Sequence, residues 1–286
     1  MSKSMKKIID LGMHPFADTF ITENQLNMSE PVYPLQCFLD EQTGYIKLGC
    51  QTNPDDRYNL YDYSYTSANS NFSKNHWNLY ATHVSKKLKL QNSKIFEIGS
   101  NDGYLSNQFQ LLGHKVLGID SSEYMSNIAN KNGVETYCGV FTKKESIQIQ
   151  QKYGRADLII ANNVFNHAND AIDFIIGVKN LLNKDGIFVF EVPYWYNTII
   201  DKRFDQIYHE HVSYFTVKYS KFLLKKFGFV IKRIEETEYH GGSIRVYSTL
   251  NNKQIETQDV KKFIKIEKNL KLFNKNIYIK FMKELN

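Results

Sequence analysis

KIFEIGSNDGYL, residues 94–105, places a short apolar strand directly before a turn with two glycines and the start of a helix. Gly99 and Gly103 let the backbone turn tightly and let a ligand approach the main chain and the helix N-terminus. Open α/β sheets bind ligands at this kind of strand end. The stretch therefore predicts an α/β fold with a ligand site at the carboxyl edge of its first core strand.

Strand candidates recur after this turn, with helical patterns between most of them. They cover residues 115–120, 134–139 (the weakest), 157–162 and 186–192. Alternating strands and helices predict a mostly parallel sheet with right-handed crossovers. After a helical stretch, residues 229–236 and 243–250 form two further strand candidates, joined by a turn with Gly241 and Gly242. An antiparallel hairpin is therefore expected to finish the sheet.

The segments on either side differ in character. Residues 1–74 are rich in Asn, Asp, Tyr and Ser and predict small strands and loops. A helix is expected from about Asn75 to Leu90, with Trp77, Tyr80, Val84 and Leu88 on one face. We divide the chain into an N-terminal region, 1–74, a central domain, 75–250, and a C-terminal amphipathic helix, 251–286.

The C-terminal helix is expected to carry one apolar stripe. Its members recur at three- and four-residue steps: Phe263, Ile266, Leu270, Phe273 and Ile277. The stripe favours packing on the helix's own domain, and a contact between two copies of the chain is the alternative.

Composition sets broad limits. Thirty-six Lys and Arg against 30 Asp and Glu give a net charge of +6. The basic residues are too dispersed to indicate a nucleic-acid partner. Three cysteines without a Cys-x-x-Cys spacing suggest a reducing cytoplasm rather than a disulfide framework. The N-terminus does not look like a leader peptide and no apolar run is long enough to span a membrane, so a cytoplasmic protein without a membrane partner is expected.

The glycine turn is flanked by acids. Glu97 and Asp102 would repel a pyrophosphate, and the middle glycine of a dinucleotide motif is absent. S-adenosylmethionine has an amino group and no phosphate, so it suits this turn. Asp120 ends the next strand, where its carboxylate can accept both ribose hydroxyl protons.

A second group of ionisable residues follows later strands. His167 lies in the loop after the fourth strand, and YHEHVSYF places Tyr208, His209, Glu210 and His211 after the fifth. Both loops leave the same edge of a parallel sheet, so the groups can converge. General-base and substrate-positioning chemistry is the favoured interpretation. A structural polar cluster and a metal site are the alternatives, and we expect no metal because further ligands at suitable spacing are missing.

The pattern E-x-G-x-x-x-G with a later acid resembles the class I S-adenosylmethionine-dependent methyltransferases, whose Rossmann-like sheet also ends in an antiparallel hairpin. The resemblance implies that cofactor-binding residues lie around the first, second and fourth strand ends. They are Glu97, Gly99, Ser100, Asp102, Gly103, Asp120, Asn162 and Asn163.

Six phrases in one order look like the C-methyltransferases of nucleotide-linked keto sugars. They are IIDLGMHPFADTF, YSYTSANS, EIGSNDGYL, NNVFNHANDAIDFIIG, YHEHVSYF and HGGSIRVY. The resemblance implies that His211 is the catalytic base and that Tyr208, Glu210, His167 and Tyr65 surround the sugar. We expect Glu210 to orient or assist His211. His240 and Tyr63 are plausible neighbours.

The chain departs from that family in two places. A zinc module with four cysteines usually opens the family, but Asp40 and Thr43 stand where thiolates of the second pair would be, and Cys37 and Cys50 are out of register. The family also continues into a further α/β module after the helix at which this chain stops. These differences favour a hydroxyl oxygen slightly over a carbon as methyl acceptor.

The sequence thus predicts an enzyme that methylates a nucleotide-activated sugar for a surface glycan or capsule, through an O- or a C-methyl transfer. A homodimer through the C-terminal helix is possible. A non-catalytic module that binds the cofactor is the alternative from another class. Methylation of RNA or protein is disfavoured, because acids and tyrosines rather than a basic groove surround the predicted site.

Overall fold

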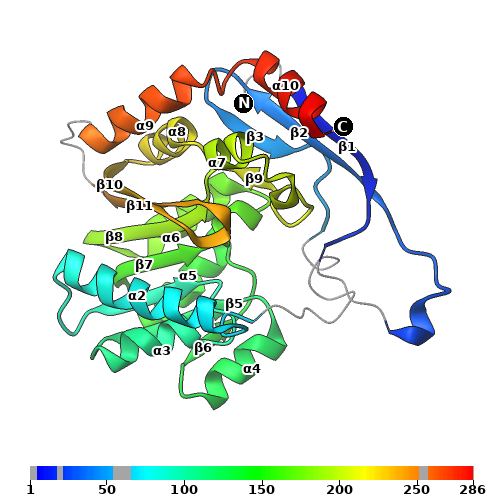
Figure 1. Cartoon of the computed structure of the whole chain (residues 1–286). Coiled ribbons are helices and arrows are strands. Elements are labelled where there is room, and N and C mark those ends of the chain that lie inside the picture. The colour runs from blue at the N-terminus through cyan, green and yellow to red at the C-terminus, as the bar shows by residue number, and fades with distance from the viewer. Residues whose placement is uncertain (1–4, 18–21, 54–65, 251–256, 286) are drawn as a thin grey trace.

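The computed structural model describes residues 5–17, 22–53, 66–250 and 257–285. At its centre is a seven-stranded sheet with the order β10-β11-β8-β7-β4-β5-β6 (Figure 1). The strands are β4 (Lys94–Ile98), β5 (Lys115–Asp120), β6 (Thr136–Cys138), β7 (Ala156–Asn162), β8 (Leu182–Pro193), β10 (Phe229–Thr237) and β11 (Ser243–Leu250). Strands β4 to β8 pair in parallel, whereas β11 pairs antiparallel with both β8 and β10. The predicted α/β fold and its terminal hairpin are confirmed.

Helices cover both faces of this sheet. They are α2 (Asn71–Leu88), α3 (Tyr104–Leu111), α4 (Glu123–Lys131), α5 (Lys143–Tyr153), α6 (Ala171–Leu181) and α8 (Val217–Lys226). In β7, Leu158 and Ile160 pack in one core with residues of α2 and α3, and Ile159 packs in the other with residues of α5, α6 and α8. All three side chains are fully buried. Burial on both faces explains why the strands are continuous apolar runs.

Helix α2 confirms the predicted apolar face, since Trp77, Tyr80 and Val84 are buried. It starts at Asn71, four residues before the predicted start. The reason is an N-cap, because the backbone N–H of Ser73 donates to Ser70 Oγ at 3.1 Å.

A second, antiparallel sheet has the order β1-β2-β3-β9. It comprises β1 (Lys6–His14), β2 (Tyr33–Asp40), β3 (Tyr45–Leu48) and β9 (Ser213–Tyr214), and the short helix η1 (Glu23–Gln25) lies between β1 and β2. Strand β9 belongs to the insertion after β8, so the N-terminal strands and the YHEHVSYF segment share one sheet. The N-terminal region therefore helps to hold the segment that carries the predicted base.

The C-terminal segment forms two helices, α9 (Gln258–Asn269) and α10 (Lys275–Leu285), rather than the predicted single helix. The chain breaks where Lys271 adopts a left-handed φ of 58°. The break lets α9 pack on the central domain while α10 lies against β1 (Figure 1).

The apolar stripe is covered by this chain itself. Phe263 is buried in the central core, and Leu270, Phe273 and Ile277 pack against the core of the second sheet. That second core also contains Trp195 of α7 (Trp195–Ile200), whose Nε1 donates to Tyr278 Oη at 3.0 Å. Of the two interpretations of the stripe, packing on the chain itself is the one the structure shows.

Candidate active site

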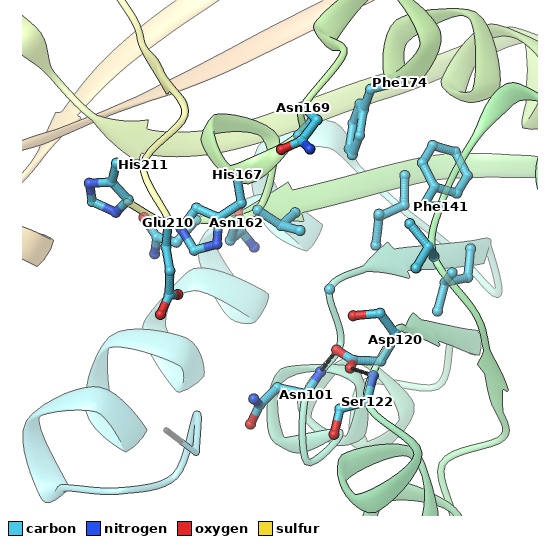
Figure 2. A pocket seen from close by; sticks show the side chains of 18 of the residues that line it. Asn101, Asp120, Ser122, Phe141, Asn162, His167, Asn169, Phe174, Glu210 and His211 are labelled. Carbon is cyan, nitrogen blue, oxygen red and sulfur yellow. Dashed lines mark hydrogen bonds between the residues drawn. The ribbon is translucent and has the colours of Figure 1, made fainter. Parts of the chain in front are cut away.

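A pocket of about 820 Å³ lies at the carboxyl ends of β4, β5 and β7. Figure 2 shows two groups of side chains along it, with Asp120 and Asn101 at one end and His167, Glu210 and His211 at the other. Its volume is in the range of small-molecule and cofactor sites. We call the first end the β5 end and the second the histidine end.

Asp120 is the central polar group of the β5 end. One carboxylate oxygen accepts the backbone N–H of Asn101 at 2.7 Å and the other accepts that of Ser122 at 2.8 Å. Burial raises the pKa of this carboxyl group, while the two amide hydrogen bonds act in the opposite direction. Each oxygen keeps a further lone pair, so the fixed carboxylate can accept hydroxyl protons from a ligand in the pocket.

The glycines of the turn are required by space and by conformation. Gly99 has a φ of 72°, and a β-carbon there would lie 2.8 Å from Val164. Gly103 has a φ of 78°, and a β-carbon would lie 3.0 Å from Ala129. Side chains rarely adopt this backbone conformation, so both positions favour glycine strongly. The predicted tight turn before α3 is present.

The remaining walls of the β5 end are amide and apolar. Asn162 and Asn163 line the pocket after β7, and Asn163 Oδ1 is buried without a hydrogen-bond partner among the described residues. Val140 and Phe141, after β6, form an apolar wall of the pocket. Figure 2 shows Phe141 on the same side as Asp120. These groups fit the parts of S-adenosylmethionine. The Asp120 carboxylate suits the ribose hydroxyls, the Asn163 amide oxygen suits the amino group, and the apolar wall suits the adenine ring.

The predicted cofactor residues divide into two groups. Gly99, Asp120, Asn162 and Asn163 line the pocket. The others, Glu97, Ser100, Asp102 and Gly103, lie behind its surface.

Three of the residues behind the surface have a visible structural role. The carboxylate of Glu97 accepts the hydroxyl of Ser106 at 2.5 Å, and burial raises its pKa to about 8. Asp102 accepts backbone N–H groups of Ala68 at 3.2 Å and Tyr104 at 3.1 Å, which ties the segment before α2 to the start of α3. The Ser100 hydroxyl fills the space beside Gly118, where a β-carbon would lie 2.5 Å from it. A direct contact of these residues with the cofactor stays a prediction.

His211 is the central residue of the histidine end. Its Nδ1 lies 2.8 Å from the carbonyl oxygen of Gln206, and its Nε2 lies 2.8 Å from Tyr208 Oη. A carbonyl only accepts, so Nδ1 carries the proton and Nε2 accepts from the Tyr208 hydroxyl. Burial lowers the pKa of His211 to about 3, so the ring is neutral near pH 7. The geometry gives a neutral imidazole with its basic nitrogen set by two fixed partners.

The contact that orients His211 is not the predicted one, whereas assistance by Glu210 stays a prediction. The contact that holds Nδ1 comes from the Gln206 carbonyl at the end of η3 (Phe204–Gln206), not from Glu210. Glu210 is buried and lines the pocket, with its carboxylate pointing away from the His211 ring in Figure 2. The backbone carbonyl replaces the carboxylate because the loop turns back on itself between the two residues.

Other predicted residues meet His211 in the same place. His167, in η2 (Phe165–His167), has its ring centre 5.2 Å from that of His211. His240, in η4 (Tyr239–Gly241), also lines the pocket, and burial lowers its pKa to about 4. Tyr65 and Tyr63 lie outside the described residues.

His209 lies outside the pocket. Its ring contacts those of Phe16 and Tyr33, with ring centres 5.8 Å apart in each pair. His209 therefore packs the insertion onto the N-terminal region. This is a structural role, which was one of the alternatives for the YHEHVSYF motif.

The sequence did not indicate several pocket residues. Asn101 supplies an amide to Asp120, and Phe141 supplies part of the apolar wall. Phe141 follows a short strand at the predicted ligand edge, so topology was a usable signal. The sequence could not indicate the role of the Gln206 carbonyl, because any residue type supplies a backbone carbonyl.

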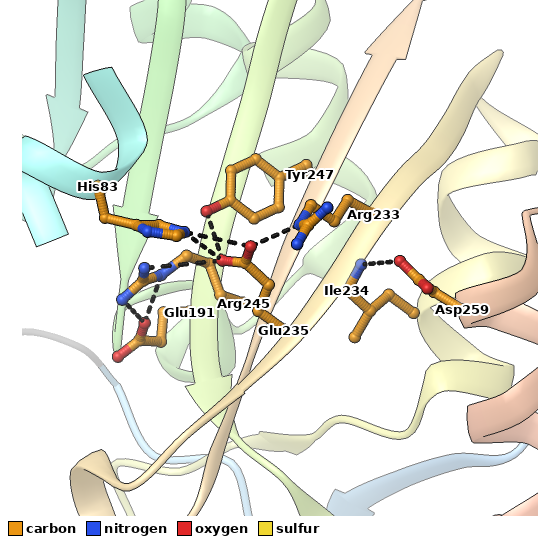
Figure 3. A network of polar contacts seen from close by, with 8 residues as sticks. All are labelled: His83, Glu191, Arg233, Ile234, Glu235, Arg245, Tyr247 and Asp259. Atoms are coloured by element: carbon orange, nitrogen blue, oxygen red, sulfur yellow. Dashed lines mark hydrogen bonds and ion pairs between the residues drawn. The ribbon is translucent and has the colours of Figure 1, made fainter. Parts of the chain in front are cut away.

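A buried ion-pair network lies on β8 and β11 next to the pocket (Figure 3). Arg245 donates to Glu191 through Nε at 2.8 Å and lies 2.7 Å from it through Nη2, and His76 Nε2 lies 2.8 Å from the other Glu191 oxygen. The backbone carbonyl of Glu191 in turn accepts the N–H of Asn163 at 2.7 Å. The network thus supports the strand ends that carry the pocket asparagines.

The residues at the expected zinc positions do not fit that metal. Asp40 begins the tight turn between β2 and β3, where Gly44 N–H donates to its carbonyl at 2.8 Å. Cys37 is fully buried in the apolar core of the second sheet, and burial raises the pKa of its thiol. Within the described parts of the chain, no three His, Cys, Asp or Glu side chains come together as a metal site.

The sheet order and the pocket at its switch point define a class I methyltransferase. A family model described as a methyltransferase domain matches residues 75–233, more than half of the chain, so the chain belongs to that family. A second model, described as a putative zinc binding domain, matches residues 1–58. In the ranges that the structure covers, no helix has the length and apolarity to cross a bilayer.

Two curated proteins and two solved structures show the range of the similarity. C-methyltransferase NovU of Streptomyces niveus is 28% identical over 242 residues, which is 84% of this chain and 57% of NovU. The ubiquinone biosynthesis O-methyltransferase of Pelagibacter ubique is 31% identical over 98 residues, 34% of this chain and 41% of that protein. The aligned parts thus span about half of each relative.

The solved structures share the fold at low identity. Magnesium protoporphyrin IX methyltransferase from Synechocystis, with bound SAH, has a TM-score of 0.50 at 16% identity and covers 62% of this chain and 83% of its own. A protein from Pyrococcus horikoshii has a TM-score of 0.51 at 15% identity and covers 70% and 100%. The predicted fold class is therefore confirmed.

Proposed function

We propose that the chain transfers a methyl group from S-adenosylmethionine to a nucleotide-linked sugar, with His211 as the general base. The observation that carries this proposal is the neutral, buried imidazole whose Nε2 is the only basic nitrogen of that ring, in the same pocket as the fixed carboxylate of Asp120. A general base must be unprotonated at the working pH and near the acceptor.

The chain's own residues divide the work between the two ends of the pocket. Asp120 would bind the ribose hydroxyls of S-adenosylmethionine, and the Asn163 side chain would donate or accept hydrogen bonds at the polar part of the same molecule. When bound, S-adenosylmethionine supplies an electrophilic methyl carbon. Tyr208 and His211 both line the pocket, and the Tyr208 hydroxyl donates to His211 Nε2, so a proton leaving the acceptor can pass to His211 directly or through that hydroxyl. In-line positioning supplies much of the remaining rate.

The longer of the two matches favours a carbon beside a ketone as the acceptor, because the match to a C-methyltransferase covers 84% of this chain. His211 would then remove the α-proton, and the enolate carbon would attack the methyl carbon as its bond to sulfur breaks. A hydroxyl oxygen is the second candidate, supported by the departures at the zinc positions. That reaction needs only removal of the hydroxyl proton before the same attack.

Methyl-labelled S-adenosylmethionine, incubated with a panel of keto and non-keto nucleotide sugars, tests the proposal. We expect label in at least one sugar, and NMR of the product distinguishes a C-methyl from an O-methyl group. Label in a keto sugar with loss of one α-proton would identify the carbon reaction. Binding of S-adenosylmethionine without label in any sugar would instead support the non-catalytic module. Synthesis of a surface glycan or capsule, in the cytoplasm, remains the proposed setting.

A further inference from the structure

The Asp, Glu, Lys and Arg residues that line the described pocket are all acidic. Its described lining contains five carboxylates and no Lys or Arg: Asp120, Asp170, Asp173, Asp205 and Glu210. The diphosphate that links a nucleoside to a sugar carries about two negative charges, and like charges at close range are disfavoured in a partly desolvated site. If the proposed acceptor binds here, its sugar can occupy the pocket, but its phosphates need a cation at the rim.

Arg203 is a cation that borders this rim on two sides. Its Nε and Nη2 donate to the two carboxylate oxygens of Asp205, each at 3.2 Å. Its guanidinium also lies against Gly241, where a β-carbon would be 2.5 Å from Arg203 Cζ. Asp205 lines the pocket, and so does His240, the residue before Gly241. The guanidinium therefore bridges the insertion and the turn between β10 and β11.

The placement of Arg203 is fixed although its side chain is 39% exposed. Its backbone N–H donates to the Thr198 carbonyl at 2.9 Å, and its own carbonyl accepts from Gln206 at 3.1 Å. Asp205 occupies Nε and Nη2, so the N–H groups of Nη1 make no hydrogen bond to another described residue. A planar guanidinium held by a carboxylate on one edge presents its other donors in a defined direction, which suits phosphate oxygens.

We propose that Arg203 binds the phosphates of the nucleotide-linked acceptor at the rim of the pocket and so places the sugar beside His211 and His240. This assignment rests on the proposed function, since it takes a nucleotide sugar as the acceptor. It makes Arg203 a specificity residue that favours phosphorylated acceptors over free sugars.

The chain provides a matched control. Arg233, on β10, also pairs through Nε with a carboxylate two residues later, Glu235, and its side chain is 42% exposed. Arg233→Ala removes the same charge from the same type of ion pair but away from the pocket. Binding of thymidine diphosphate, uridine diphosphate and S-adenosylhomocysteine to wild type, Arg203→Ala, Arg203→Lys and Arg233→Ala is measured by calorimetry at low and high salt, with melting temperatures as a check on folding.

We expect Arg203→Ala to weaken the preferred nucleoside diphosphate about ten-fold or more, the size of a lost charged hydrogen bond. Arg203→Lys should restore part of this affinity, because lysine keeps the positive charge but lacks the paired N–H donors of the guanidinium. The affinity for S-adenosylhomocysteine in every variant, and the affinity for all three ligands in Arg233→Ala, should stay within about two-fold of wild type.

Equal affinity of Arg203→Ala and Arg233→Ala for both diphosphates would overturn the assignment, as would a wild type that binds neither. A parallel assay separates this failure from that of the proposed function. If a nucleotide sugar is methylated and Arg203→Ala leaves its KM unchanged, only the role of Arg203 fails. If no nucleotide sugar is methylated, the proposed function itself fails.

Discussion

The hydroxyl oxygen of Tyr208 lies 2.8 Å from Nε2 of His211, and this contact, together with the Gln206 carbonyl on Nδ1, fixes the tautomer of the ring. The proposed base therefore needs no carboxylate to orient it. A polar pair held by the backbone of one short loop is also pre-organised before the acceptor arrives.

Replacement of His211 by alanine should lower kcat about 100-fold or more, because it removes the proton acceptor. Tyr208→Phe should lower kcat less, since Nε2 keeps its lone pair. Binding of S-adenosylmethionine should stay near wild type in both variants, because neither residue lies at the β5 end. Steady-state kinetics and calorimetry measure these effects, with His83→Ala as an exposed control. Unchanged turnover in His211→Ala would remove it from the base role.

The protonation of His211 should be unusual. Its folded-state pKa is lowered to about 3 from 6.5, so the neutral base persists as the pH falls from 8 to 5. The same depression makes this histidine's contribution to stability complete above pH 6.5 and lost as the pH falls toward 3. Nitrogen-15 NMR of the labelled imidazole should show a neutral ring with Nδ1 protonated at pH 5. A ring that titrates near pH 6.5 in the folded protein would contradict the burial argument.

Asp120 should dominate cofactor binding at the β5 end. Asp120→Ala leaves two backbone N–H groups without their acceptor and removes the predicted ribose ligand, so the Kd of S-adenosylmethionine should rise about ten-fold or more. Asp102→Asn should have a smaller effect, because the Asp102 carboxylate holds backbone N–H groups behind the pocket surface. Calorimetry with both variants compares the two acids. A larger loss in Asp102→Asn would mean that the turn reorganises when the cofactor binds.

Loss of one partner of the Glu191–Arg245 pair should destabilise the fold strongly. Both side chains are buried, and Arg245 also lies over the Tyr80 ring at 4.1 Å. Arg245→Met should therefore lower the free energy of unfolding by about 3–5 kcal/mol, because it leaves a buried carboxylate with only His76. Arg233→Ala, at a more exposed pair, should cost about 1 kcal/mol or less. Urea unfolding measures both, and similar values for the two variants would argue against a desolvated pair.

The second sheet should depend on α10 rather than on zinc. Phe281 of α10 is buried in the core with β1 and β2, so Phe281→Ala should cost about 3–5 kcal/mol. Incubation with a chelator should leave the melting temperature unchanged, since the cysteines needed for a structural zinc site are missing. A drop in melting temperature on chelation, restored by zinc, would show that the module binds metal after all.

The sequence by itself determined the class of fold and indicated several of the residues that line the pocket. Apolar runs at regular spacing fixed the strands, and Gly99, Gly103 and Asp120 marked the ligand edge, because strand ends and left-handed turns restrict residue type locally. YHEHVSYF indicated the second cluster because its ionisable residues follow a strand that ends at the same edge of the sheet. None of these inferences required a long-range contact.

Only the tertiary structure decided how the groups are directed. It turned the Glu97 carboxylate toward Ser106, gave the orientation of His211 to a backbone carbonyl, and joined β9 of the insertion to the N-terminal strands. It also broke the C-terminal stripe at Lys271, so that its two halves cover different cores. These features depend on contacts between segments far apart in the chain, and side-chain direction at a site is set by such packing rather than by the local pattern.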